Sequence, residues 1–380
     1  MKKKVLLVGE KYSSNLGDGV ICEVVENVLQ NDDFEVINFD ISGRSGYFEN
    51  VNEFNFKKEN LVYIKSKIKK ILSIFGYKKM GKNFHNIYEK FKENFDNIVS
   101  NKKIDSVVFA GGQMFIDTFI YQIDYICQYC EKNNINIIFN CCGGGKILNE
   151  SLLKKVLNYK SIRYISVRDN YEKLKILSNK KIINCYDSAI LASDIYKINR
   201  EPEFEYGIGI MFSTLQSPKM QIDFLRKMLN VLIDNNVKFK IFTNGSYKDY
   251  SFAKFILSEV NLNEDVYLME RPTTPMELVN IILRFKKILS MRLHSMIIAY
   301  SYNIPSISIS WDNKVNIFFE KIGLKNNCYT LKSRQEEILE KLFLLDNECI
   351  NEKIKEKIYS DINNNFKCIK NIINEKKVDN

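Results

Sequence analysis

Arg292 and His294 stand two residues apart, and His294 is one of only two histidines in the 380-residue chain. Apolar runs at 288–289 and 296–299 flank them, a pattern typical of a strand that ends at the start of a helix. In open parallel sheets, ligands bind at this kind of junction. A fixed cation beside a group that titrates near neutral pH suits an anionic substrate and a proton transfer. The spacing alone also fits a histidine that caps the helix or lies in the core.

A second polar group follows the first predicted strand, at 5–9. Asn15 and Asp18 stand there, at the opening of a predicted helix at 20–29. Free N–H groups at a helix N-terminus bind anions, and an acid at this point is either a helix cap or a catalytic group. The segment lacks the third glycine of the dinucleotide-binding fingerprint, so a dinucleotide site is not indicated.

Glycine clusters end two consecutive predicted strands. Gly111 and Gly112 follow the strand that begins at residue 106, and the glycines at 143–145 follow the strand at 135–140. Glycine lets the backbone approach a ligand closely, so we expect both clusters to line one cleft.

Two further cations stand at strand ends. Arg168 follows the strand at 164–167, and its planar guanidinium suits a carboxylate or phosphate, although a pair with Asp169 or Asp187 is the alternative. Asp169 is also placed to cap the next predicted helix. Lys314 follows the strand next to that of His294, so it either approaches the same cleft or is an ordinary surface lysine.

Short apolar runs alternate with helical patterns along nearly the whole chain, which favours parallel sheets covered by helices on both faces. A polar stretch at 195–205 separates two series of strands. We therefore predict an α/β protein with two Rossmann-like domains, 1–195 and 204–333, that face each other across a cleft, followed by a helical tail at 334–380. The strands are predicted at 5–9, 35–39, 106–110, 135–140, 164–167 and 182–186, and then at 206–212, 238–243, 266–269, 288–291 and 305–310.

Composition narrows the class of protein. Lys and Arg outnumber Asp and Glu by 56 to 46, and the net charge of +10 favours an acidic partner such as a phosphorylated metabolite or an anionic membrane surface. No stacked-aromatic or recognition-helix pattern indicates nucleic acid.

The nine cysteines lie mostly in apolar segments and no signal-peptide pattern is present, so we expect reduced thiols and a cytoplasmic protein. Cys127 and Cys130 have no second such pair, so no metal site is expected, and no apolar run reaches the ~18 residues of a membrane span.

A basic segment at 56–82 interrupts the alternation, within an insertion at 41–85. It carries nine lysines and one glutamate, interleaved with apolar and aromatic residues at helical spacing. This pattern is typical of a helix that lies on an anionic membrane surface, which would place the protein at the inner face of the membrane. An exposed helix with solvated lysines is the alternative.

Taken together, these segments resemble the polysaccharide pyruvyl transferase family, over residues 5–325. Three features depart from the family pattern: Gln113 stands where a third glycine is common, Ser188 stands where a proline often follows the Asp, and the lysine-rich insertion is additional. The motifs that carry the resemblance occur in the family's order: Asn15-x-Gly17-Asp18, Gly111-Gly112, Ser166-Val167-Arg168-Asp169, Asp187, Arg292-x-His294, Ala299, Pro305, and Lys314-Val315 before Phe318.

The resemblance implies a fold similar to GT-B glycosyltransferases. It also implies transfer of a pyruvyl group from phosphoenolpyruvate to two hydroxyls of a sugar, which forms a cyclic ketal and releases phosphate without metal or other cofactor. Arg168, Arg292 and Lys314 can supply the cations that the phosphate and carboxylate require. His294 is the expected general acid, with its pKa raised by the bound anion, and Asp18 is the expected general base. The predicted substrate-binding set is completed by Asn15, Gly111, Gly112 and Ser295.

Two alternatives stay open. A glycosyltransferase of the same fold would use a nucleotide sugar, and Glu277 is the carboxylate placed to hold its ribose. A non-catalytic scaffold in surface-polysaccharide assembly is the other. The acceptor, free or lipid-linked, and its polymer (capsule, exopolysaccharide or cell wall) also stay open, because the motifs do not cover the loops that would bind it.

Overall fold

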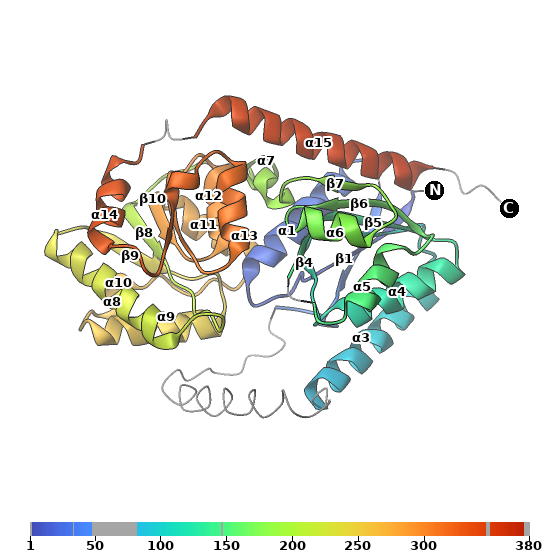
Figure 1. The fold of residues 1–380 in the computed structure, drawn as a ribbon, viewed down its shortest axis with the longest axis horizontal. Helices are drawn as coiled ribbons and strands as arrows, with labels where there is room; N and C mark the ends of the chain where they lie inside the picture. Colours follow the sequence, from blue (N-terminus) through green and yellow to red (C-terminus); the bar gives the residue numbers. More distant parts are fainter. Residues whose placement is uncertain (1, 33, 48–81, 146, 347–349, 376–380) are drawn as a thin grey trace.

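The computed structural model describes residues 2–32, 34–47, 82–145, 147–346 and 350–375, which form two α/β lobes (Figure 1). The predicted membrane-surface segment at 56–82 lies outside the described residues apart from residue 82. Both sheets are parallel and each is covered by helices, so the predicted fold class is confirmed.

The first lobe holds a parallel sheet in which β1 lies between β2 and β3 and is almost wholly buried. Within the described residues the strand order is β2 (Glu35–Asp40), β1 (Lys4–Gly9), β3 (Ser106–Phe109), β5 (Asn136–Gly144), β6 (Ile162–Val167) and β7 (Ile182–Asn184), with β4 (Gly112–Phe115) paired to β5. Its helical segments are α1 (Leu16–Gln30), α3 (Lys82–Asn101), α4 (Ile120–Lys132), α5 (Glu150–Leu157), α6 (Tyr171–Leu177), η1 (Ser188–Leu191) and α7 (Ala192–Tyr196).

The second lobe holds a smaller parallel sheet in the order β12 (Cys328–Thr330), β11 (Ser306–Ser310), β10 (Phe285–Ser290), β8 (Phe204–Gly209) and β9 (Phe239–Phe242). The strand predicted at 266–269 is wrong, because α10 (Glu264–Tyr267) forms there and Leu268 makes an isolated bridge to Ile241. The other helical segments of this lobe are α8 (Pro218–Asp234), α9 (Tyr247–Glu259), α11 (Pro275–Leu283), α12 (Leu293–Ser301), α13 (Asn313–Lys321), η2 (Lys325–Asn327) and α14 (Gln335–Leu344).

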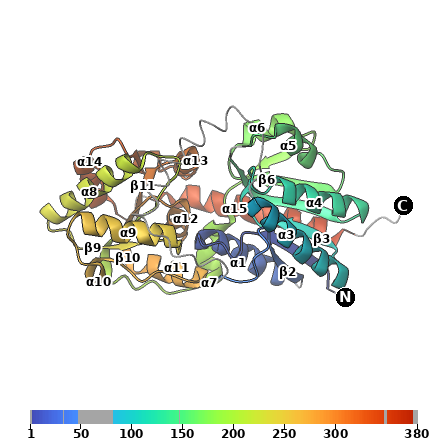
Figure 2. The same ribbon diagram turned by 90° about the horizontal axis from the view of Figure 1, so that it is seen from below.

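The last helix, α15 (Glu352–Asn374), runs back across both lobes (Figures 1 and 2). Near its start, Lys355 Nζ donates to the carbonyl of Ser301 at the end of α12, at 2.9 Å. Further along, Asn365 Nδ2 donates to Asn140 Oδ1 in β5, at 2.8 Å. The helix therefore ties the two lobes together.

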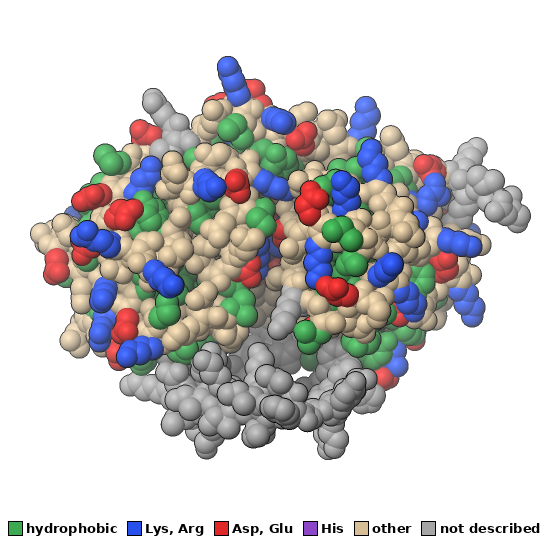
Figure 3. Space-filling model, viewed as in Figure 1, with side chains coloured by type: hydrophobic (Ala, Val, Ile, Leu, Met, Phe, Trp, Pro, Cys, Tyr) green, Lys and Arg blue, Asp and Glu red, His purple; other side chains and the backbone are tan. Residues whose placement is uncertain are grey.

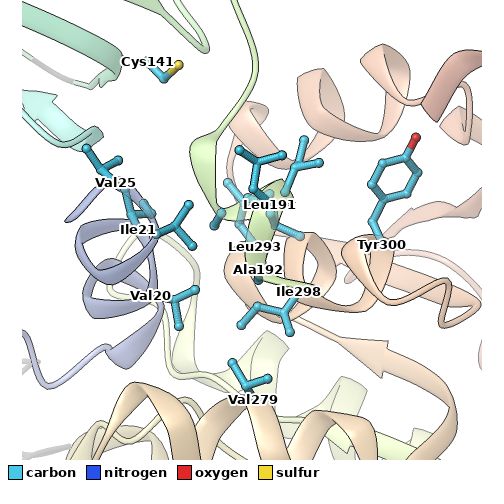
Figure 4. Close-up of a cluster of buried hydrophobic side chains, with 14 of the residues drawn as sticks. Val20, Ile21, Val25, Cys141, Leu191, Ala192, Val279, Leu293, Ile298 and Tyr300 are labelled. Carbon is cyan, nitrogen blue, oxygen red and sulfur yellow. The ribbon is translucent and has the colours of Figure 1, made fainter. Parts of the chain in front are cut away.

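A single apolar cluster continues across the boundary between the lobes. Val20 and Ile21 of α1 lie in it with Val279 of α11, Leu293 of α12 and Leu191 of η1 (Figure 4). Helix α1 is buried along nine of its residues, because it packs against its own sheet and against the second lobe. This packing fixes the start of α1 against the start of α12.

Charged side chains of both signs are interspersed over the face seen in Figure 3. Among the described residues, no helix is long and apolar enough to cross a bilayer.

Candidate active site

A cavity of about 160 Å³ lies between the lobes, where strands of both sheets end. The first lobe contributes residues that follow β1, β4 and β6, and the second contributes residues that follow β10 and β11. The cavity thus brings together six of the predicted site residues with five others. Its lining is Glu10, Asn15, Asp18, Gln113, Ile116, Arg168, Arg292, Leu293, His294, Trp311 and Lys314.

His294 is the second residue of α12 and is buried. Its Nε2 lies 3.3 Å from Arg168 Nη1 and 3.9 Å from Asp187 Oδ2, and its Nδ1 lies 3.7 Å from Asp18 Oδ1. A guanidinium has only donors, so Nε2 accepts from Arg168 in the neutral ring. The ring proton is then on Nδ1, the nitrogen nearer Asp18.

Burial lowers the pKa of His294 below its ordinary value of 6.5 in the protein alone. The carboxylates of Asp18 and Asp187 oppose this shift, and the cations of Arg168 and Lys314 add to it. An anion bound among these cations would screen them and move the pKa upward. The predicted rise in the His294 pKa refers to the protein with its anion bound, and it stays a prediction.

Asp18 is the third residue of α1, and the interpretation of it as a helix cap is wrong. Asn15 occupies the N-cap position, and its Nδ2 donates to Asp18 Oδ2 at 2.9 Å. Asn15 Oδ1 is buried and finds no hydrogen-bond partner among the described residues. The pair thus offers acceptor oxygens to the cavity.

Arg168 is buried between two carboxylates, Asp187 at Nη1 and Asp169 at Nε (3.4 Å). Burial alone would lower the pKa of Arg168, but these two carboxylates raise it above its ordinary value. The structure therefore combines both interpretations of Arg168, since it is paired and still lines the cavity. The predicted Asp169 cap is wrong, because Asn170 is the N-cap of α6 and Asp169 Oδ1 accepts from the Gly144 N–H at 2.7 Å.

Arg292 immediately precedes α12 and is also paired. Its Nε donates to Asp249 Oδ2 at 2.8 Å, and its Nη2 contacts the same oxygen. Asp249 is fully buried and accepts from the Phe212 N–H at 3.1 Å through its other oxygen. These bonds hold the guanidinium rigidly, and none of the bonds to the described residues uses Nη1, which is therefore available to a ligand.

Lys314 is a cavity residue and not a surface lysine. Its Nζ donates to Gln113 Oε1 across the boundary between the lobes at 3.1 Å, and it lies 4.8 Å from the ring centre of Trp311. The Trp311 ring is fixed by its own bond to the Met291 carbonyl, at 2.7 Å. Burial, followed by repulsion from Arg168, lowers the pKa of Lys314.

Three predicted substrate-binding residues, Ser295, Gly111 and Gly112, lie beside the cavity. They are not among the described residues that line it. Ser295 Oγ donates instead to Asn244 Oδ1 at 2.6 Å. Gly111 and Gly112 have φ values of +119° and +77°, which residues with a side chain rarely adopt. They form a turn of the backbone next to the Asp18 carboxylate. Glu277 is exposed and accepts from the Thr273 N–H at 2.7 Å, so it is engaged at the start of its own helix.

Glu10 and Trp311 are not among the predicted site residues. Each directly follows a strand, so the rule that singled out Arg168 and Arg292 would have found both. The contact between Gln113 and Lys314 depends on how the lobes pack, and it leaves no sequence signal. Within the described residues, no group of three or more His, Cys, Asp or Glu side chains is placed to hold a metal ion.

Comparisons with known proteins give a family and a fold. The model of a family described as polysaccharide pyruvyl transferase matches residues 15–313. No curated protein sequence matches the chain significantly.

Three solved structures illustrate the fold. The Neisseria meningitidis UDP-GlcNAc 2-epimerase bound to UDP-GlcNAc is 12% identical, with a TM-score of 0.58 over 99% of this chain and 100% of that one. S. aureus MnaA, in a co-structure with UDP, is 13% identical with a TM-score of 0.57 over 100% of both chains. The Methanocaldococcus jannaschii UDP-GlcNAc 2-epimerase is 12% identical with a TM-score of 0.54 over 95% and 99%. At such identities the likeness shows the fold alone.

Proposed function

The chain belongs to the polysaccharide pyruvyl transferase family, and we propose from this premise that it transfers a pyruvyl group from phosphoenolpyruvate to two hydroxyls of a saccharide. The product is a cyclic ketal on a surface polysaccharide or its precursor, and phosphate is released. The observation that carries the proposal is the convergence of Arg168, Arg292, Lys314, His294 and Asp18 on one cavity.

The donor matches the cations of the cavity. Phosphoenolpyruvate carries a phosphate and a carboxylate on the same carbon, and guanidinium groups bind both through paired N–H groups. Arg168 and Arg292 are held in place by carboxylates behind them, so little side-chain entropy is lost on binding. Lys314 supplies a third cation, which must exchange its bond with Gln113 for one with the ligand.

The chemistry requires one proton to reach carbon and two oxygens to replace phosphate. His294, as imidazolium, protonates the methylene carbon, which becomes the methyl group and leaves a cationic centre at the neighbouring carbon. The first hydroxyl oxygen bonds to that centre and its proton passes to Asp18. The second hydroxyl oxygen then bonds to the same carbon as the bond to phosphate oxygen breaks, and its proton leaves with phosphate.

Asp18 and His294 are placed to complete the cycle. Their nearest atoms, Oδ1 and Nδ1, are 3.7 Å apart, so the Asp18 carboxylate faces the N–H of Nδ1 and stabilises the imidazolium. After the reaction Nε2 takes a proton from solvent, and Asp18 releases the proton it accepted to solvent. Asp187, 3.9 Å from Nε2, stabilises the imidazolium from the other side.

The proposal is tested with phosphoenolpyruvate itself. Isothermal calorimetry should detect binding to the wild type in the micromolar range and its loss in Arg292→Ala. Arg226→Ala is the matched control, since Arg226 is exposed on α8, outside the cavity, and pairs with Asp223. Phosphate release from phosphoenolpyruvate, dependent on an added saccharide, then identifies the reaction. Binding of a nucleotide sugar in place of phosphoenolpyruvate would contradict the proposal.

The same proposal includes contact of residues 56–82 with the inner face of the cytoplasmic membrane, where a lipid-linked acceptor would be available. Their nine lysines are the support for it. Deletion of 56–82 should move the protein from the membrane fraction to the supernatant, and an unchanged distribution would contradict this contact.

A further inference from the structure

Glu10 lines the cavity, and neither donor binding nor the proton transfers above use it. It is the first residue after β1 and shares the first-lobe wall with Asn15 and Asp18. Its side chain is 20% exposed, and its Oε1 accepts a bond from Arg44 Nη2 at 3.3 Å. Its Oε2 makes no bond to the described residues.

Arg44 is committed mainly to another carboxylate, Asp40. Arg44 Nε donates to Asp40 Oδ1 at 3.0 Å, and Asp40 also accepts from the N–H groups of Tyr12 at 2.8 Å and Ser42 at 2.9 Å. Asp40 therefore accepts the short hydrogen bonds, whereas Glu10 accepts one long bond, from Arg44. Burial, with the negative charge of Asp18, raises the pKa of Glu10 to about 8, so its carboxyl is protonated at neutral pH.

Glu10, Asn15 and Asp18 together thus offer one donor and two acceptors to the cavity. A protonated carboxyl donates through its hydroxyl, whereas the Asp18 carboxylate and the unpartnered Asn15 Oδ1 only accept. A sugar hydroxyl both donates and accepts, so two neighbouring hydroxyls match this set. The cations that suit the donor lie elsewhere in the lining: Arg292 and Lys314 come from the second lobe, and Arg168 follows β6 of the first.

We propose that Glu10, Asn15 and Asp18 form the subsite for the acceptor diol, in which Glu10 donates a hydrogen bond to one of the two hydroxyl oxygens that enter the ketal. This inference rests on the proposed function, because only ketal formation requires two hydroxyls of one saccharide in the same cavity. Ionisation of Glu10 above pH 8 would remove this donor and place a second negative charge beside Asp18. The charged or titratable groups around Glu10 are Asp18 and Cys22 from α1, Asp40 at the end of β2, Arg44 after it, and Arg168, Arg292, His294 and Lys314 in the cavity lining.

The test uses an acceptor that must contain the right diol: surface glycan of the source cells, freed of pyruvyl ketals by mild acid. Phosphate release is measured against glycan concentration at saturating phosphoenolpyruvate. Glu10→Ala should raise the KM for glycan by about tenfold, the value of one hydrogen bond of about 1.4 kcal/mol, without changing the calorimetric Kd for phosphoenolpyruvate. Glu10→Gln keeps a neutral donor and should stay within about threefold of the wild type at pH 7.

The pH profile separates a binding role from a structural one. The wild-type KM for glycan should rise above pH 8, whereas that of Glu10→Gln should not. The matched control is Glu23→Gln: Glu23 is a half-buried acid of α1 that bonds Tyr196 and Tyr47 outside the cavity, so its replacement should leave the wild-type profile intact.

Each failure has a distinct meaning. Without phosphate release from the wild type on this glycan, the proposed function fails, and the inference fails with it. An active wild type with an unchanged KM in Glu10→Ala overturns the inference alone. If Glu10→Ala does not fold, the Glu10→Gln variant decides. A KM for glycan that still rises above pH 8 in Glu10→Gln overturns the inference.

Discussion

Gly17 and His294 meet across the boundary between the lobes: a Cβ placed on Gly17 would lie 2.3 Å from the Cβ of His294. Both atoms are anchored to helix backbone, one at the start of α1 and the other at the start of α12. The helices therefore approach as closely as glycine permits. This approach brings the next residue, Asp18, to within 3.7 Å of the His294 ring.

Gly17→Ala should cost stability and turnover together. Alanine favours a helix by about 1 kcal/mol over glycine, but its methyl group has no space here, so we expect a net loss of about 1–3 kcal/mol in urea unfolding. Forced separation of α1 from α12 should also lower kcat by at least about tenfold, because it moves Asp18 away from His294. Gly46→Ala is the control, since no atom of the described residues lies within 4 Å of that Cβ. Wild-type stability and rate in Gly17→Ala would mean that the two helices separate freely.

His294→Gln should lower kcat by ~10²-fold or more while leaving the Kd for phosphoenolpyruvate within a few-fold of the wild type. Burial places the His294 pKa below 6.5 in the protein alone, and a bound trianion should raise it. The acid acts only when protonated, so both rates fall as pH rises. We expect the fall in kcat/KM, which reports the free enzyme, at lower pH than the fall in kcat. More than a tenth of the wild-type kcat in His294→Gln would exclude the acid role.

Asp187→Asn should destabilise the protein through Arg168, which is buried and would lose one of its two carboxylate partners. Because Asp169 remains at 3.4 Å, we expect the low end of the range for broken buried pairs, about 3 kcal/mol. Removal of Asp187 also takes away a charge that raises the His294 pKa, so the fall in kcat/KM should move to lower pH. Urea unfolding and the pH profile measure the two effects.

The matched variant for that experiment is Asp223→Asn. Asp223 forms an exposed pair with Arg226 at 3.7 Å, and such pairs contribute less than about 1 kcal/mol. Equal losses in Asp187→Asn and Asp223→Asn would show that the Arg168 pair is solvated and contributes little.

The site was predictable where it depends on strand ends. Asn15, Arg168, Arg292 and Lys314 each follow a strand that the apolar pattern reveals, and parallel strands necessarily end at the same edge. Alternation of strands and helices was sufficient for the fold class for the same reason. The prediction failed at 266–269, where Asn263 caps a short helix and only Leu268 reaches the sheet.

Other features depend on contacts between distant segments, and no local pattern carries them. Asp249 reaches Arg292 because α9 packs beside the start of α12, 43 residues further along the chain. Burial of that carboxylate requires the folded second lobe. The sequence therefore indicated cations for a ligand and offered Asp169 and Asp187 as partners of Arg168, but nothing in it pointed to Asp249 as the partner of Arg292.

Asn365→Leu should weaken the hold of α15 on the first lobe. Asn365 is buried, its Nδ2 donates to Asn140 Oδ1 at 2.8 Å, and its Oδ1 accepts from Tyr164 OH at 3.0 Å. Leucine has a similar size but leaves both partners without a bond, which should cost about 1–3 kcal/mol in urea unfolding. Asn364→Leu, at the exposed neighbouring position, should change stability by less than about 0.5 kcal/mol. The opposite outcome, a neutral or stabilising Asn365→Leu, would mean that the apolar side of α15 holds the helix and that the polar contacts add only register.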